Sequence, residues 1–478
     1  MNFVSVWMVS TLTMILPIAI ILSLGRFYKV EEFGNYAVAA SFMSTVAIFL
    51  TFGLGNVVSF EIAAVPNRNK SEISKLIISS FIVLAIFSGI GVFITGFALY
   101  LLHYNGEIVS LVILLGFGYW SIGANSVVGG VFMGTKEMHI PAISAFAILL
   151  SAVLSVFPCL YLHCPIWQIA LAWSLSQGVG CLVTLWFIYK KGFFVKPKKY
   201  SGQIILIIRR SLGIGFDSII SRLGANLTNI LLPLYLTSYQ IGLFNGAFKP
   251  FVLFAFAGEC CLRFFSPYIA GVRYESREKV QEYVVLTHKL VTFFTLTLLI
   301  LPVFFSTTMI NIVFGSKLIE SAHYMVLLAF GYMIYYLPPQ SPPLMALGME
   351  WKVIWCSIIR LLLNIIGIVV FIPKFGILGA IIAINISFVG YWMTTIFLYR
   401  KAKIMPITGF VRYLAFTVMI FALGFAVKQW FSGGLTGIIT FLLTGYLLSV
   451  IIYFDRSERR IAILYARPLM RKLGFGFI

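Results

Sequence analysis

Long apolar runs recur along the whole chain, and this repetition limits what the chain can fold into. Hydrophobic residues occupy 60% of the 478 positions, and charged residues only 10%, whereas a typical soluble domain has about 25% charged residues. A helix needs about 20 apolar residues to cross a bilayer. The sequence therefore predicts an all-α polytopic membrane protein with about fourteen transmembrane helices. The expected spans are 3–25, 34–60, 76–102, 108–133, 141–162, 166–189, 211–236, 241–266, 287–314, 321–347, 353–372, 377–398, 413–430 and 435–454.

The two halves of the chain resemble each other at an offset of about 210 residues. "EEFGNYAVA" matches "YQIGLFNGA", "FMGTKEMHI" matches "ALGMEWKVI", and "WFIYKK" matches "IFLYRK", in the same order. A repeat of six helices gives two parallel copies, as in transporters built from two lobes. We therefore expect a six-helix lobe over 1–190, a basic linker over 191–210, a second six-helix lobe over 211–400, and two further helices with a basic tail over 401–478.

Basic residues are distributed unevenly between the two sides of the predicted membrane. With the N-terminus inside, the inner segments hold 25 of the 35 lysines and arginines, and the outer loops hold four: Arg26, Lys29, Lys317 and Lys374. Because basic residues collect in cytoplasmic loops, both termini are expected in the cytoplasm. The formal net charge of +20 then reflects membrane orientation rather than nucleic-acid binding.

The seventh span, "GFDSIISRLGANLTNILLPLYL", has an arginine near its middle. Arg222 lies about 17 Å from the inner end of the span at about 1.5 Å per residue, and a cation there costs at least about 2.5 kcal/mol. Asn226 and Asn229 share its helix face, whereas Asp217, five residues earlier, is not an i,i+4 partner. This polar stripe is expected to face a cavity or a polar neighbour.

The eighth and eleventh spans also have basic residues. Lys249 shares a face with Asn245 and directly precedes Pro250, which is expected to bend the helix. Arg360 lies nearer the inner end of its span, where snorkelling and a role in a cavity compete evenly. Two interpretations of Arg222 and Lys249 stay open: a buried pair with Asp217 or Glu61, or a cationic surface for a phosphate-bearing substrate.

Other features of the sequence suit structural roles. The fourth span is rich in glycine and alanine, which suits close helix packing. Tyrosines and tryptophans in "IYYLPP" and "GYW" are interpreted as interface anchors. Cys159 and Cys164 are near enough along the chain to meet at an outer helix end, but we interpret them as buried free thiols. The sequence has no recognisable catalytic or metal-binding motif, and no cofactor is expected.

Several stretches together resemble the polysaccharide flippases (O-antigen or Wzx-type) of the multidrug/oligosaccharidyl-lipid/polysaccharide (MOP) exporter superfamily. They are "EEFGNYAVAASF", "FGLGNVVSFEIA", "GVFMGTKEMHIPAIS" and "MALGMEWKVIWCSIIRLLLNIIGIVVFIPKFGILGAIIAINIS". The resemblance implies two lobes around a central cationic cavity. It also implies translocation of an undecaprenyl-pyrophosphate-linked oligosaccharide across the bacterial cytoplasmic membrane by alternating access.

The resemblance also implies roles for individual residues and partners. Arg222 and Lys249 would bind pyrophosphate or acidic sugars, with contributions from Arg26, Arg360 and the three asparagines, Asn226, Asn229 and Asn245. Asp217 or Glu61 would couple transport to a proton or sodium gradient. The expected partners are the lipid-linked glycan, membrane lipids, and the polysaccharide polymerase and chain-length machinery. The alternatives are an ion-coupled multidrug or small-molecule exporter of the same fold, a membrane enzyme such as an O-antigen polymerase, and a structural assembly subunit.

Overall fold

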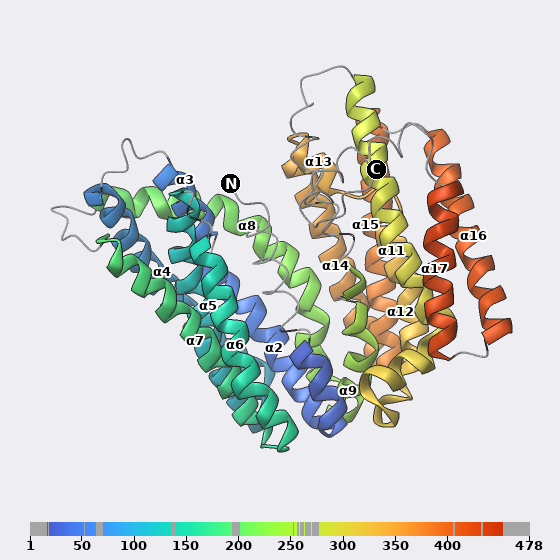
Figure 1. Ribbon diagram of the computed structural model, residues 1–478, viewed down its shortest axis with the longest axis horizontal. Coiled ribbons are helices and arrows are strands. Elements are labelled where there is room, and N and C mark those ends of the chain that lie inside the picture. The colour runs from blue at the N-terminus through green and yellow to red at the C-terminus, as the bar shows by residue number, and fades with distance from the viewer. Residues whose placement is uncertain are drawn as a thin grey trace, which may run out of the picture. The chain divides into compact units, whose positions relative to one another are not determined.

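The computed structural model describes most of the chain, and its regular structure there is helical (Figure 1). The described residues are 17–63 except 18 and 52, 70–193 except 136 and 138, 201–251, a few positions between 253 and 269, and 277–452 except 405–406 and 432–433. The all-α fold class predicted from the sequence is confirmed. The chain divides into two compact units: unit 1 comprises Met1–Gly246 and Asn364–Ala380, and unit 2 comprises Ala247–Leu363 and Ile381–Ile478.

Unit 1 contains the helices of the first half of the chain. They are α2 (Val30–Thr51), α3 (Leu54–Ala63), α4 (Lys70–Leu102), α5 (Gly106–Gly134), α6 (His139–Tyr161), α7 (Ile166–Lys190), α8 (Ser201–Leu231), the short η2 (Leu232–Leu234) and most of α9 (Ser238–Phe248). The unit also includes the end of α14 and the start of α15. The α5 helix packs on α7, α2, α3 and α4, which makes it the centre of the unit.

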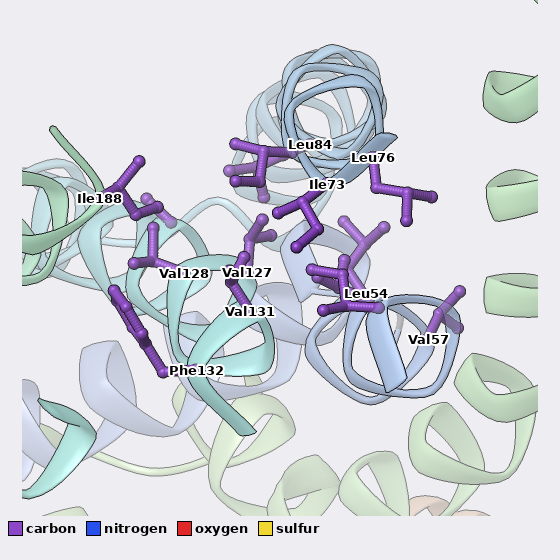
Figure 2. Close-up of a cluster of buried hydrophobic side chains, with 14 of the residues drawn as sticks. Leu54, Val57, Ile73, Leu76, Leu84, Val127, Val128, Val131, Phe132 and Ile188 are labelled. Carbon is purple, nitrogen blue, oxygen red and sulfur yellow. The ribbon is translucent and has the colours of Figure 1, made fainter. Parts of the chain in front are cut away.

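Apolar side chains from the six helices α3 to α8 fill one core of unit 1 (Figure 2). Within a bilayer the alternative to this packing is contact with lipid and not with water, so van der Waals contacts between such side chains hold the helices together. The residues labelled in Figure 2 are Leu54 and Val57 of α3, Ile73, Leu76 and Leu84 of α4, Val127, Val128, Val131 and Phe132 of α5, and Ile188 of α7.

Glycines let α3 and α5 approach backbone to backbone. A Cβ atom built on Gly130 of α5 would lie 2.3 Å from the carbonyl oxygen of Gly55 of α3. No side chain larger than hydrogen fits at such a distance without moving the backbone. The prediction that the glycine-rich fourth span serves close packing is therefore confirmed.

A second close approach joins two stretches that the sequence comparison had matched. A Cβ atom on Gly34 of α2 would lie 2.6 Å from the carbonyl oxygen of Ser238 and 2.7 Å from the backbone nitrogen of Gly242 of α9. Gly34 and Gly242 occupy equivalent positions in "EEFGNYAVA" and "YQIGLFNGA". The six-helix lobes themselves stay a prediction.

Unit 2 contains most of the helices of the second half. They are α11 (Arg277–Phe314), the short η3 (Ser316–Leu318), α12 (Ser321–Tyr336), α13 (Pro342–Ala346), the first part of α14 (Glu350–Phe375), most of α15 (Ile377–Ala402), α16 (Ile407–Phe431) and α17 (Leu435–Ile452). The α16 and α17 helices pack on each other and on α11 (Figure 1). Within α11 the backbone leaves the helical conformation at Phe305, and the helix also contains Pro302.

Two spans expected as continuous helices are interrupted, and those predictions were wrong. The second span is split into α2 and α3 around Gly53, which has a φ of +70°. The tenth span is split because α12 ends at Tyr336 and α13 begins only at Pro342. Proline has no N–H to donate and clashes with the preceding turn, so Pro338 and Pro339 account for this second break.

Polar side chains satisfy the backbone of the second break. The Gln340 side-chain amide donates to the carbonyl oxygen of Tyr336 at 2.6 Å, and the backbone carbonyl oxygen of Gln340 accepts from the Tyr399 hydroxyl at 3.0 Å. His288 of α11 contacts the Gln340 side chain and lies 3.1 Å from the Tyr399 hydroxyl. Non-helical backbone at membrane depth needs such internal partners.

Seven helices of the described residues are long and apolar enough to cross a membrane. They are Lys70–Leu102, Gly106–Gly134, His139–Tyr161, Ile166–Lys190, Glu278–Phe314, Trp351–Phe375 and Ile377–Ala402. Two shorter apolar helices, Phe416–Trp430 and Leu435–Tyr446, follow them. The chain is therefore a multi-pass helical membrane protein.

Candidate functional site: two cationic clusters

The first cluster lies in unit 1, around the polar stripe of α8. Arg222 is exposed and is close enough to Tyr119 of α5 to interact with its hydroxyl electrostatically. One turn further along α8, the Asn226 amide donates to the Ser44 hydroxyl of α2 at 3.1 Å. The α8 stripe therefore faces polar groups of α2 and α5, as the sequence predicted for a helix with this pattern.

Further along α8 the polar stripe becomes buried. The Thr228 hydroxyl donates to the Asn364 side chain at 3.1 Å. Asn229 is only 1% exposed, and its side-chain oxygen accepts no hydrogen bond from the described residues. An unsatisfied buried carbonyl oxygen costs about 1–3 kcal/mol. The sequence placed Asn229 correctly on the polar stripe, and the structure buries it there.

The end of α9 is shaped as the sequence predicted. The helix ends at Phe248, and Lys249 adopts a turn directly before Pro250. The Lys249 ammonium lies 5.8 Å from the centroid of the Phe248 ring, a distance typical of a cation–π interaction. Asn245 is fully buried and donates to the carbonyl oxygen of Ile241 at 3.0 Å, so its amide group is used to satisfy its own helix.

The second cluster lies in unit 2, around Arg360 of α14. Its guanidinium lies 5.6 Å from the centroid of Tyr335 and 5.4 Å from that of Tyr391. These two rings are stacked, with centroids 5.4 Å apart and an interplanar angle of 24°. An Nη1–H of Arg360 also reaches the Tyr335 hydroxyl at 3.4 Å. The arginine is therefore held by aromatic faces from α12 and α15.

A continuous group of aromatic rings links Lys249 to Arg360 within unit 2, and we call it the aromatic cluster. Tyr332 contacts Phe248 with centroids 6.2 Å apart and Phe388 with centroids 5.1 Å apart. Phe388 in turn lies 4.7 Å from Tyr335. The members of the cluster are Phe248, Tyr332, Tyr335, Phe388 and Tyr391.

Sequence reasoning missed the aromatic cluster. Tyr335 and Tyr391 were expected to anchor helix ends at the membrane interface, but Tyr391 is only 8% exposed and both rings pack on Arg360. A signal was present, because Tyr332 and Tyr335 are three residues apart, as are Phe388 and Tyr391. Residues three apart share a helix face, and each pair could have been set against Arg360.

The remaining predicted residues lie on other helices or have side chains outside the described residues. Arg26 is exposed at the end of the helix before α2, and Glu61 is partly buried on α3. The backbone of Asp217 belongs to α8, but its side chain lies outside the described residues. Ion coupling by Asp217 or Glu61 therefore stays a prediction. Within the described part of the chain, no group of three or more histidine, cysteine, aspartate or glutamate residues is arranged to hold a metal ion.

Comparison with solved structures identifies the fold. The lipid II flippase MurJ, in an inward closed conformation, matches with a TM-score of 0.74 at 13% identity, over 97% of this chain and 98% of MurJ. An inward-facing multidrug resistance transporter of the MATE family, in the MOP superfamily, matches with a TM-score of 0.61 at 18% identity, over 81% and 94%. A MOP superfamily transporter from Pyrococcus furiosus matches with a TM-score of 0.56 at 17% identity, over 84% and 94%.

Sequence comparisons add the family. No curated protein matches the chain. A family model described as polysaccharide biosynthesis protein matches residues 1–255, which is more than half of the chain. The resemblance inferred from the sequence is confirmed by this match and by the fold. The chain therefore belongs to the polysaccharide biosynthesis protein family and has the fold of the MOP superfamily.

Proposed function

We propose that this protein is a flippase that moves an undecaprenyl-pyrophosphate-linked oligosaccharide, the repeat unit of an O-antigen or another surface polysaccharide, across the bacterial cytoplasmic membrane. The family match supports a role in polysaccharide biosynthesis, and the fold supports transport rather than catalysis. By the charge asymmetry of the loops, both termini face the cytoplasm.

The observation that carries the proposal is the environment of Arg222. This arginine is exposed on α8, at a position near the middle of a predicted span, and its stripe is lined by the hydroxyl of Ser44 and the amide of Asn226. A guanidinium presents forked N–H donors that match phosphate oxygens in two parallel hydrogen bonds. A pyrophosphate can replace the water that solvates such a cation and so offset its cost in the membrane.

Arg360 and Lys249 supply the second part of the proposed binding surface. The faces of Tyr335 and Tyr391 stabilise the Arg360 cation, and this cation–π contact acts on the flat face of the guanidinium. Lys249 acts as a point charge at the other end of the aromatic cluster. In this proposal each of these cations holds the pyrophosphate or acidic sugars at some stage of alternating access.

Export in living cells tests the proposal. A strain that lacks its own flippase gene is given this protein as wild type, Arg222→Ala, Arg222→Lys or Arg209→Ala, and surface polysaccharide is measured at equal membrane levels. Arg209 is an exposed arginine on the same helix, near its inner end, and serves as the matched control. We expect Arg222→Ala to lower export by roughly 10- to 100-fold, Arg222→Lys to retain more of it, and Arg209→Ala to export normally.

Two results would contradict the proposal. Wild-type protein that restores no polysaccharide in any donor strain, but lowers the cellular content of small toxic compounds, would favour the multidrug exporter. Normal export by Arg222→Ala would keep the flippase function and remove Arg222 from the binding surface.

A further inference from the structure

The connection from α6 to α7 has the geometry of a Schellman motif. The helix is followed by His163 in the left-handed conformation, with a φ of +51°. The backbone N–H of Cys164 donates to the carbonyl oxygen of Cys159 at 3.0 Å, and that of His163 donates to Leu160 at 3.3 Å. This pair of nested bonds, one spanning six residues and one spanning four, defines the motif.

The Schellman motif brings two particular side chains together, and here both are cysteines. The residue that follows the left-handed position usually contacts the residue five positions earlier, which makes Cys164 the partner of Cys159. Their thiol groups are close enough to interact as hydrogen-bond partners. Both residues are partly exposed rather than buried, so the expectation of buried thiols was wrong for this pair.

The structure and the proposed membrane orientation together point to a redox site, and we infer that Cys159 and Cys164 form a disulfide at the outer surface of the membrane. The inference rests on the orientation stated under Proposed function, in which the fifth span ends outside. Disulfides form and persist outside the cytoplasmic membrane of bacteria, whereas cytoplasmic thiols are kept reduced. The fold-back of the Schellman turn supplies the close approach that a disulfide requires.

The reaction is an exchange with a disulfide-bonded oxidant outside the membrane, such as a protein disulfide. The thiolate of one cysteine attacks the oxidant and forms a mixed disulfide, and one sulfur of the oxidant leaves as a thiolate. The thiolate of the second cysteine then attacks the sulfur of the first and closes the bond between them. The oxidant takes up two electrons and is released as a dithiol, and the two cysteines lose two protons.

The turn closed by this disulfide supports the link between the first helix and α2. The Tyr28 hydroxyl donates to the carbonyl oxygen of Cys164, and the Phe27 ring packs edge-on against His163 with centroids 6.0 Å apart. Burial raises the pKa of Tyr28 to about 12, so this hydroxyl keeps its proton and its donor role at physiological pH. A covalent bond across the turn would hold its contacts with Phe27 and Tyr28, the residues that follow Arg26, in one conformation.

Differential alkylation measures the bond directly. Cells expressing the full-length protein are lysed in denaturant with one alkylating reagent, and the protein is then reduced and treated with a second reagent of different mass. We expect Cys159 and Cys164 to carry mainly the second label, while Cys181 and Cys356, both buried in the helices α7 and α14, carry the first. In Cys159→Ser, Cys164 should carry the first label.

A pair of variants at His163 tests whether the turn creates the bond. Glycine adopts a positive φ without strain, so His163→Gly keeps the Schellman turn and the disulfide. Proline is fixed near a φ of −65° and has no N–H, so His163→Pro should lose the disulfide. Equal oxidation in both variants would overturn the role of the turn.

First-label alkylation of Cys159 and Cys164 in wild-type cells would overturn the proposal. The proposal has two premises: the turn lies outside the membrane, and its geometry allows the two cysteines to bond. Oxidation of the purified protein by a copper–phenanthroline catalyst then separates them. A bond that forms only in the purified protein places the turn on the reducing side, and no bond in either case shows that the geometry is wrong. Because the readout is mass and not export, this result is independent of whether the protein is a flippase.

Discussion

Arg222 and Arg360 are both arginines of predicted transmembrane spans, but their surroundings differ. Arg222 is exposed on α8, with a tyrosine hydroxyl near it and the Asn226–Ser44 hydrogen bond one turn away. Arg360 is packed against the rings of Tyr335 and Tyr391. The first arginine contributes little to the packing of its unit, whereas the second helps to join three helices of its unit.

This difference separates two ways in which a membrane protein can hold a cation. An exposed cation among hydroxyl and amide groups contributes mainly to what it binds, and the fold hardly depends on it. A cation that aromatic faces hold contributes to binding and to packing, because its removal leaves the rings without their partner. The two arginines should therefore respond differently to the same substitution.

The largest effect is expected for Arg360→Ala. Each cation–π contact is worth about 0.5–2 kcal/mol, so losing two should lower the free energy of unfolding by about 2–3 kcal/mol and reduce export as well. Thermal unfolding in detergent, followed by tryptophan fluorescence, checks this. Lys352→Ala is the control, since Lys352 is exposed on the same helix. Equal melting temperatures for the two variants would show that the aromatic contacts do not support the unit.

The next effect is expected for Arg222→Ala, and it should be confined to function. Loss of a charge-assisted hydrogen bond costs about 1.5–3 kcal/mol, which corresponds to roughly a 10- to 100-fold weaker hold on a pyrophosphate. The melting temperature should match that of Arg209→Ala, because exposed substitutions change stability by no more than about 0.5 kcal/mol. A large drop in the melting temperature would place Arg222 in a structural role and remove the contrast with Arg360.

A smaller effect is expected at the hydrogen bond between Asn226 and Ser44. Either alanine substitution removes one neutral hydrogen bond, worth about 1 kcal/mol, and should reduce the export rate by roughly fivefold. In the double variant the two losses should not add, because both remove the same bond. Additive losses in export rate would mean that the two side chains act on the substrate separately.

The smallest effect is expected for Tyr391→Phe. This substitution removes the hydroxyl that contacts Ser341 but keeps the ring that stacks on Tyr335 and faces Arg360. Stability should fall by no more than about 1 kcal/mol, whereas Tyr391→Ala should approach the effect of Arg360→Ala. Melting temperatures of the two variants make the comparison. A larger loss for phenylalanine than for alanine would show that the hydroxyl, and not the ring, supports the arginine.

Local sequence patterns predicted the parts of the molecule that depend on neighbours along the chain. The four-residue spacing of Arg222 and Asn226 predicted a shared face, and Pro250 predicted a bend next to Lys249, where α9 ends. These features follow from helix geometry and from the missing N–H of proline. They are properties of a single helix, so the sequence of that helix is enough to predict them.

Contacts between distant segments were beyond the sequence. Arg360 meets Tyr335 and Tyr391, which lie 25 and 31 residues away in other helices, and no pattern within α14 indicates which rings it will face. The break between α12 and α13 was also missed, because an apolar run looks the same whether it is continuous or interrupted. Tyr399, which donates to the backbone of Gln340 in that break, comes from a distant helix as well.

Transport by the purified protein in lipid vesicles tests the central claim most directly. Vesicles are prepared with an undecaprenyl-pyrophosphate-linked glycan, and the fraction that reaches the outer leaflet is measured with an impermeant lectin. The account predicts rapid movement with wild-type protein and with Arg209→Ala, and movement roughly 10- to 100-fold slower with Arg222→Ala. Equal rates for Arg222→Ala and wild type, with both well above the protein-free rate, would contradict the claim that Arg222 binds the pyrophosphate.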